Sequence, residues 1–172
     1  MKTAIALMTL ASLAGVAAAA DIPHRKPGLW EMTSHSTTSK GAEISRRICL
    51  DRESEDLLNR QGVASAQEAC SKVEMHSSGN QFTAKAVCNL GSVKMTSEAT
   101  TTFTGDSAST TKVHTTFDPP LAGRSQSESQ DEGKWLGACP ADMKPGDMIL
   151  KTGGTHPHEM RTSLRQMFKS QP

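Results

Sequence analysis

The amino-acid sequence predicts a mainly β fold in which about seven antiparallel strands follow one another as a meander. Segments of strand length alternate between polar and apolar residues, as strands with one buried face do. Turn signals such as Ser78-Gly79-Asn80 and Thr104-Gly105-Asp106 separate these segments. A sheet of this kind must curl or be covered to bury one face. We therefore expect a strongly curved sheet or barrel with one or two short helices, and a β-sandwich is the alternative.

Residues 1–20 have the pattern of an export signal. Lys2 supplies a positive start, an apolar run extends from Ala4 to Val16, and Ala18-Ala19-Ala20 supplies the small residues that a signal peptidase requires. The apolar run is shorter than the roughly 20 residues of a bilayer span. We expect cleavage after Ala20, a periplasmic or secreted location, and no membrane span after cleavage.

Two strands and a helix are predicted at the start of the mature chain. The first strand covers Leu29 to Thr37, where Trp30 shares one face with alternate residues, and the second covers Glu43 to Leu50. Asp51 has the character of a helix N-cap. A short helix should follow it and end at Gly62.

The middle of the chain contains the clearest strand signals. Residues 70–77 and 81–89 flank a tight turn and predict a hairpin. Strands are then predicted over 92–103 and 107–117, where small and hydroxylated side chains dominate. Residues 123–132 are polar on both faces, so we expect an edge strand, a rim or a loop there.

The end of the chain returns briefly to apolar character. Lys134 is followed by residues 135–140, which have apolar character, and Pro145-Gly146-Asp147 makes a turn. We place one disulfide-bonded β domain at residues 21–150 and a polar tail at 151–172, with a possible helix over 159–168.

Four cysteines, Cys49, Cys70, Cys88 and Cys139, all follow the leader. An even number in an exported chain indicates two disulfides, and three pairings are possible. Close-spaced ligand pairs, typical of a Cys₄ zinc site, do not occur. We prefer Cys70–Cys88 with Cys49–Cys139, because the first pair lies at equal distances on either side of Gly79 in the predicted hairpin.

The apolar pattern of this hairpin favours a register one residue away from the symmetric one. The shifted register places Val73 opposite Ala86 and Met75 opposite Ala84, which buries more apolar surface. It also moves Cys88 away from Cys70. A β-bulge near Cys70 would allow both the apolar pairs and the disulfide.

Three groups of residues carry a family resemblance. They are Arg25–Glu31, Cys49-Leu50 before an acidic segment, and Gly133–Pro140 followed by Pro145-Gly146-Asp147. In these positions the chain resembles exported bacterial proteins known as domain of unknown function 3617, over about Pro23 to Met148. The resemblance implies an envelope location and a compact domain. It implies no activity, cofactor or catalytic residue, and the tail after Ile149 extends beyond it.

Two sets of residues are candidates for a binding site. His156, His158 and Met160 form a His-x-His segment with a nearby thioether, which has the donor types that bind copper or zinc. A solvated tail is the simpler interpretation of that segment. Trp30 and Trp135 are candidates for the lining of a ligand cavity, although aromatic residues in so thin a core are more often its anchors.

Three further histidines, His35, His76 and His114, fall on predicted strands as solvent-facing positions. A shared outer face would bring two of them near each other. Their positions in sequence do not decide which two.

Composition and motifs narrow the function classes. The leader holds one of the 19 basic and none of the 18 acidic residues, so the mature chain is electrically balanced, which disfavours nucleic-acid binding. The sequence lacks a G-x-S-x-G elbow, an H-E-x-x-H segment, a P-loop and a dinucleotide fingerprint. We predict no catalytic residues and no cofactor, and an enzyme is not favoured.

The favoured hypothesis is a non-catalytic binding module for a small apolar or amphipathic ligand. The concave face of the sheet would hold the ligand, because Ala84, Ala86 and Ala99 leave space there. An envelope protein that binds another protein or has a structural role is the first alternative, through a polar edge around Ser125 to Gln130. Copper or zinc handling by the His-x-His segment is the second.

Overall fold

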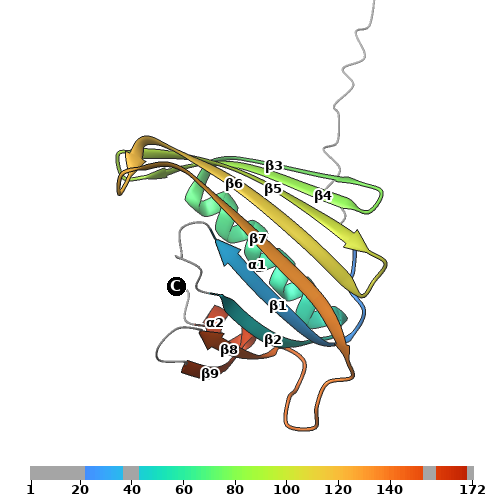
Figure 1. Cartoon of the computed structure of the whole chain (residues 1–172). Coiled ribbons are helices and arrows are strands. Elements are labelled where there is room, and N and C mark those ends of the chain that lie inside the picture. Colours follow the sequence, from blue (N-terminus) through green and yellow to red (C-terminus); the bar gives the residue numbers. More distant parts are fainter. Residues whose placement is uncertain (1–21, 37–42, 153–157, 170–172) are drawn as a thin grey trace, which may run out of the picture.

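The computed structural model describes residues 22–36, 43–152 and 158–169, so the expected leader lies outside the described residues. One antiparallel sheet holds all the described strands, in the order β3-β4-β5-β6-β7-β1-β2-β8-β9 (Figure 1). The strands are β1 Gly28–Ser36, β2 Ile44–Leu50, β3 Cys70–Ser78, β4 Gln81–Leu90, β5 Val93–Thr104, β6 Ala108–Leu121, β7 Arg124–Gly137, β8 Asp147–Thr152 and β9 His158–Ser163. The helices are α1 Arg52–Ala69 and α2 Leu164–Lys169.

The predicted curved antiparallel sheet is confirmed, with more strands than expected. The sheet is curved and not closed on itself. The β-sandwich alternative is wrong, because the described strands form one sheet and not two.

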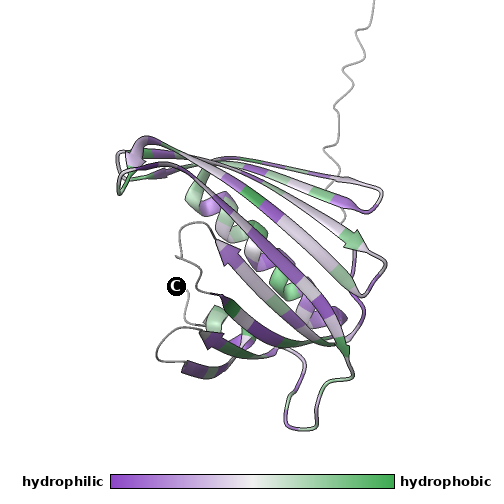
Figure 2. Cartoon of the chain, in the orientation of Figure 1, coloured by the Kyte–Doolittle hydropathy of each residue, from purple (hydrophilic) through white to green (hydrophobic). Residues whose placement is uncertain are grey.

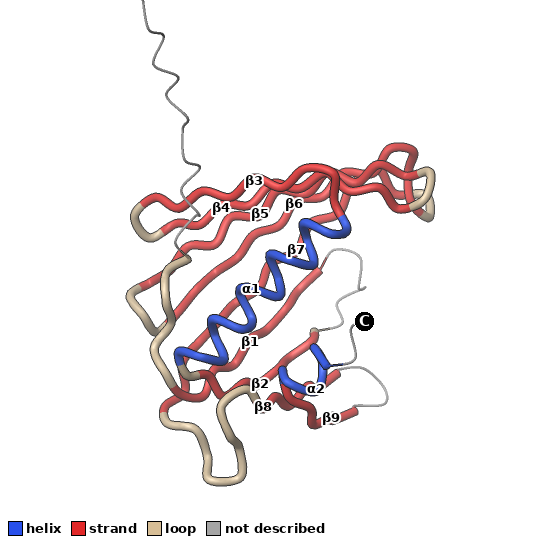
Figure 3. Tube along the Cα trace, turned by 180° about the vertical axis from the view of Figure 1, so that it is seen from behind, coloured by secondary structure: helices blue, strands red, loops and turns tan. Residues whose placement is uncertain are grey.

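The two faces of the sheet have different surroundings. Helix α1 lies against one face, which we call the inner face, and the opposite face is the outer face (Figure 3). Along β5 the residues alternate accordingly: Met95 and Ala99 are half-buried on the inner face, whereas Lys94 and Glu98 are exposed on the outer face. Helix α1 therefore covers the inner face, where the sequence analysis expected a ligand to bind.

The apolar core lies between the sheet and the two helices. Trp30, Ile48, Leu50 and Leu164 are buried, and Leu57 of α1 packs against them with other partly buried residues. Each such side chain contributes roughly 1.5–3 kcal/mol through burial. Figure 2 shows how few strongly hydrophobic segments the sheet has. The core is as small as the composition indicates.

The C-terminal segment continues this fold. Strand β9 pairs with β8, with Leu150 opposite Met160, and α2 places Leu164 in the core at 1% exposure. The helix predicted over 159–168 begins at Leu164 instead, because residues 158–163 pair with β8 as strand β9. The described part of residues 151–172 is thus packed with the β domain.

Helix α1 is longer than predicted. Asp51 caps it, since the Asp51 carboxylate accepts from Ser54 N at 2.8 Å and Ser54 Oγ accepts from Asp51 N at 2.9 Å. The helix continues past Gly62, its predicted end, to Ala69. A glycine inside a helix costs about 1 kcal/mol relative to alanine, and the three alanines, the glutamine and the glutamate that follow Gly62 are strong helix formers.

Strand β7 is central, which corrects the expectation of an edge, rim or loop at residues 123–132. It lies between β6 and β1. Its polar inner face is tolerated because neighbouring strands supply partners; Ser34 Oγ, for example, donates to the Asp131 carboxylate. Among the described residues, every buried side-chain nitrogen and oxygen has a hydrogen-bond partner.

The two disulfides have the pairing preferred from the sequence. Cys70 is bonded to Cys88, and Cys49 is bonded to Cys139. The hairpin register places Val73 opposite Ala86, with a register shift just after Cys70 that brings Cys70 opposite Cys88. The bridges close loops of 18 and 90 residues. By the loop-entropy model they contribute roughly 3 and 4–5 kcal/mol.

Candidate functional site

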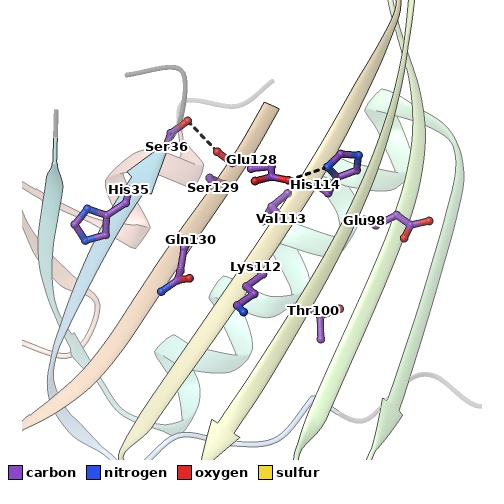
Figure 4. A pocket seen from close by; sticks show the side chains of 10 residues that line it. All are labelled: His35, Ser36, Glu98, Thr100, Lys112, Val113, His114, Glu128, Ser129 and Gln130. Atoms are coloured by element: carbon purple, nitrogen blue, oxygen red, sulfur yellow. Dashed lines mark hydrogen bonds and ion pairs between the residues drawn. The ribbon is translucent and has the colours of Figure 1, made fainter. Parts of the chain in front are cut away.

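A groove of about 680 Å³ crosses the outer face of the sheet. Four neighbouring strands build it, and most of its lining residues are at outer-face positions of these strands (Figure 4). Its principal lining side chains are His35 on β1, Glu128 and Gln130 on β7, Lys112 and His114 on β6, and Glu98 and Thr100 on β5. Because these residues alternate with inner-face residues along paired strands, the sheet fixes their relative positions.

Three of the lining residues form an acidic row. Glu98, His114 and Glu128 lie directly opposite one another on β5, β6 and β7. Glu98 Oε1 accepts from Lys85 Nζ at 2.8 Å, and the hydrogen bond to Glu98 raises the pKa of the exposed Lys85. His114 Nδ1 lies 3.7 Å from Glu128 Oε1. Both carboxylates of this row therefore have a partner within the sheet.

The next row along the strands contains the groove's lysine, and we call it the Lys112 row. Thr100, Lys112, Gln130 and His35 lie opposite one another on β5, β6, β7 and β1. Gln130 Nε2 donates to Glu132 Oε1 at 2.9 Å, and His35 Nε2 lies 3.8 Å from Glu43 Oε2. The row offers hydroxyl, amide, ammonium and imidazole groups and contains no carboxylate.

His35 and His114 both line the groove, so these two of the three strand histidines share the outer face of the sheet. They do not converge, because β7 separates β1 from β6 and two strand spacings amount to about 10 Å. Among the described residues, no group of three or more His, Cys, Asp and Glu side chains is placed to hold a metal ion. The groove has the chemistry of a binding surface with several hydrogen-bond donors.

The two tryptophans lie outside the groove. Trp30 is fully buried in the core, and its Nε1 donates to Lys26 O at 2.8 Å. Trp135 is half-buried; its Nε1 donates to Pro27 O at 3.0 Å, and Lys26 Nζ sits 4.1 Å from the ring centroid. Both indole N–H groups are thus used to hold the segment before β1.

The two end motifs of the sequence meet in this region. Strands β1 and β7 pair, with Trp30 opposite Trp135, although the two residues are far apart in sequence. Gly28 has a φ of +137°, and a Cβ on it would collide with the carbonyl of Gly137. Cys139 then ties the end of the second motif to β2 through Cys49. The Trp and Gly residues of the two motifs therefore have a packing role.

A family model described as "Protein of unknown function (DUF3617)" matches residues 25–139, which run from the first motif to the second. The chain belongs to this family. No protein with curated annotation matches the DUF3617 chain, and no solved structure matches it. In the part of the chain that the structure describes, no helix is long and apolar enough to cross a membrane.

The remaining candidates of the DUF3617 chain lie apart from the groove. His156 is outside the described residues, and His158 and Met160 are exposed on β9 at the far edge of the sheet. A second groove, of about 310 Å³, lies near α2 and includes Asp142, whose pKa is lowered by its hydrogen bond from Arg161. The polar segment Ser125 to Gln130 is not an edge, which removes the observation behind a protein-binding edge there.

The residues that sequence reasoning missed in the groove are Lys112, Gln130, Thr100 and the two glutamates. Each is a polar residue on the outer face of a strand. Exposed polar residues are common on strands, so nothing in the sequence marks these as part of a binding site. Only the strand order and register bring them together. The alternation within β5 and β6 was visible in the sequence, but the pairing of β7 with β1 was not.

Proposed function

We propose that this DUF3617 protein is a non-catalytic binding module that holds a small amphipathic ligand in the outer-face groove. The volume of the groove, about 680 Å³, carries the proposal. Sites for small molecules have volumes of roughly 300–1,000 Å³. Of the apolar and amphipathic ligands favoured from the sequence, we retain the amphipathic ones and place them on the outer face instead of the inner face.

The scaffold under the groove supports the proposal. The groove lies on β1, β7, β6 and β5, which are interior strands of the sheet with hydrogen-bonded neighbours on both sides. A site on interior strands needs little reorganisation when a ligand binds. The methylene stems of Lys112, Gln130 and Glu98 give apolar surface beneath polar ends, which suits an amphipathic molecule.

The chemistry of the groove favours binding over catalysis. The two histidines lie on separate strands, and each has a carboxylate at 3.7–3.8 Å. The two sequence motifs pack β1 against β7, and none of their residues lines the groove. We therefore assign no catalytic role to any groove residue.

We also propose that the protein works outside the cytoplasm. The expected leader at residues 1–20 and the two disulfides support this, because disulfides persist in oxidising compartments. N-terminal sequencing of the protein recovered from a periplasmic extract should begin at Asp21. Recovery of the intact N-terminus from the cytoplasm alone would contradict the proposal of export.

Fluorescence titration with the neutral probe N-phenyl-1-naphthylamine tests the binding function. Thr100→Arg places a long side chain across the groove and should weaken probe binding about tenfold, or about 1.4 kcal/mol. Thr104→Arg is the matched control, because Thr104 is exposed on the same face of the same strand and does not line the groove. Equal affinity in both variants, or no saturable binding to the unmodified chain, would contradict the proposed function.

A further inference from the structure

Lys112 lies at the centre of the groove, and none of the ion pairs among the described residues includes it. It lies on β6 between Thr100 on β5 and Gln130 on β7 (Figure 4). Among the described residues, no carboxylate lies within ion-pair distance of its ammonium group. The groove therefore has one positive charge whose partner must come from solvent or from a ligand.

The neighbours of Lys112 can complete a site for an acidic group. Thr100 has a hydroxyl group on one side, and Gln130 has an amide on the other. Gln130 Nε2 uses one N–H on Glu132 Oε1 at 2.9 Å, so its second N–H is available to a ligand. An ammonium group flanked by neutral donors is the arrangement that binds a carboxylate or sulfonate through charge-assisted hydrogen bonds.

The carboxylates of the groove do not offer an equivalent place to a cation. Glu98 Oε1 accepts from Lys85 Nζ at 2.8 Å, and Glu128 Oε1 lies 3.7 Å from His114 Nδ1. They do limit how much negative charge the groove accepts. Glu98 and Glu128 are each two residues along the strand from the Lys112 row, a separation of about 7 Å. A second negative charge on the ligand would be repelled at that distance.

We infer that the ligand of the groove carries a single acidic group, which Lys112 binds with Thr100 and Gln130, and an apolar body that lies over the side-chain stems. The inference rests on the proposed function and names its ligand class. Long-chain monocarboxylates and monosulfonates have this chemistry. Neutral amphiphiles lack the negative charge that Lys112 attracts. Dianions carry a second negative charge, which Glu98 and Glu128 of the acidic row would repel.

Two fluorescent probes that differ by one sulfonate test the ligand class. Anilinonaphthalene sulfonate should bind the full chain about tenfold more tightly than N-phenyl-1-naphthylamine, its neutral counterpart. Lys112→Met keeps most of the aliphatic stem and removes the charge, so it should abolish this preference by weakening the binding of the sulfonate probe about tenfold. Lys112→Arg should restore the preference.

Lys94→Met is the matched control, because Lys94 is an exposed outer-face lysine on β5 that does not line the groove. It should leave the affinities of both probes unchanged. Decanoate should displace the sulfonate probe at lower concentration than decanol does. Equal binding of the two probes, or an unchanged preference in Lys112→Met, would overturn the inference while leaving the binding function intact. Failure of both probes to bind would contradict the binding function itself.

Discussion

Single side chains before β1 and in α1 do much to hold this thin-cored molecule together. Glu55 is 3% exposed on α1, and its carboxylate accepts from Arg25 N at 3.1 Å and from Arg25 Nε at 2.8 Å. The Arg25 guanidinium also stacks over Trp30, with 5.6 Å between the guanidinium carbon and the ring centroid. A buried carboxylate of this kind is tolerable only because its partners satisfy it. Glu55 therefore attaches the first family motif to the helix.

Removal of the Glu55 carboxylate should be strongly destabilising. Glu55→Ala leaves the Arg25 guanidinium, itself 12% exposed, without its partner, and we expect a loss of about 3–5 kcal/mol in the free energy of unfolding. Urea denaturation followed by circular dichroism measures this loss. Glu53→Ala is the control in the same helical turn, since Glu53 is 79% exposed and its contact with Arg165 is worth about 0.5 kcal/mol or less. Equal losses in the two variants would contradict the structural role of Glu55.

At the scale of elements, the hairpins were the most predictable parts of the chain. Apolar residues fix their register, and Val73 opposite Ala86 is the clearest case. The extent of α1 and the central position of β7 were not predictable. Gly62 is a typical signal for the end of a helix, but the helix formers that follow it carry α1 on to Ala69. Strand β7 pairs with β1 across about 100 residues of sequence, and no local pattern encodes that pairing.

The N-cap of α1 makes a pH-dependent contribution to stability. Hydrogen bonds from the Ser54 side chain and backbone lower the pKa of Asp51. A lowered pKa in the folded state means that the stabilisation is complete above the unfolded value of about 3.9 and is lost as pH falls through the folded value. We expect Asp51→Ala to cost about 1 kcal/mol at pH 6 and progressively less below about pH 4.

Urea denaturation of the two proteins at several pH values measures this difference. Asp51→Asn keeps a capping side chain without a titrating group, so its own capping contribution should not change with pH. A gap between the unmodified chain and Asp51→Ala that stays constant from pH 6 to about pH 2 would exclude the Asp51 carboxylate as the source.

At the scale of the whole molecule, the curved sheet has one face for stability and one face for binding. The inner face, α1, α2 and the Cys49–Cys139 bridge form the stable unit. The outer face of β5, β6, β7 and β1 is left open and carries the groove. The groove was not predictable because its residues come from four strands whose order is set by the global fold, although its two histidines were recognised as outward-facing.

Amide chemical-shift mapping of the isotope-labelled chain during titration with decanoate shows whether the outer-face groove binds the ligand. We expect saturable shifts that cluster at the groove positions of β5, β6, β7 and β1, with Thr100, Lys112 and Gln130 among the largest. Saturable shifts confined to α1 and the inner face of the sheet, or shifts that never saturate, would contradict this expectation.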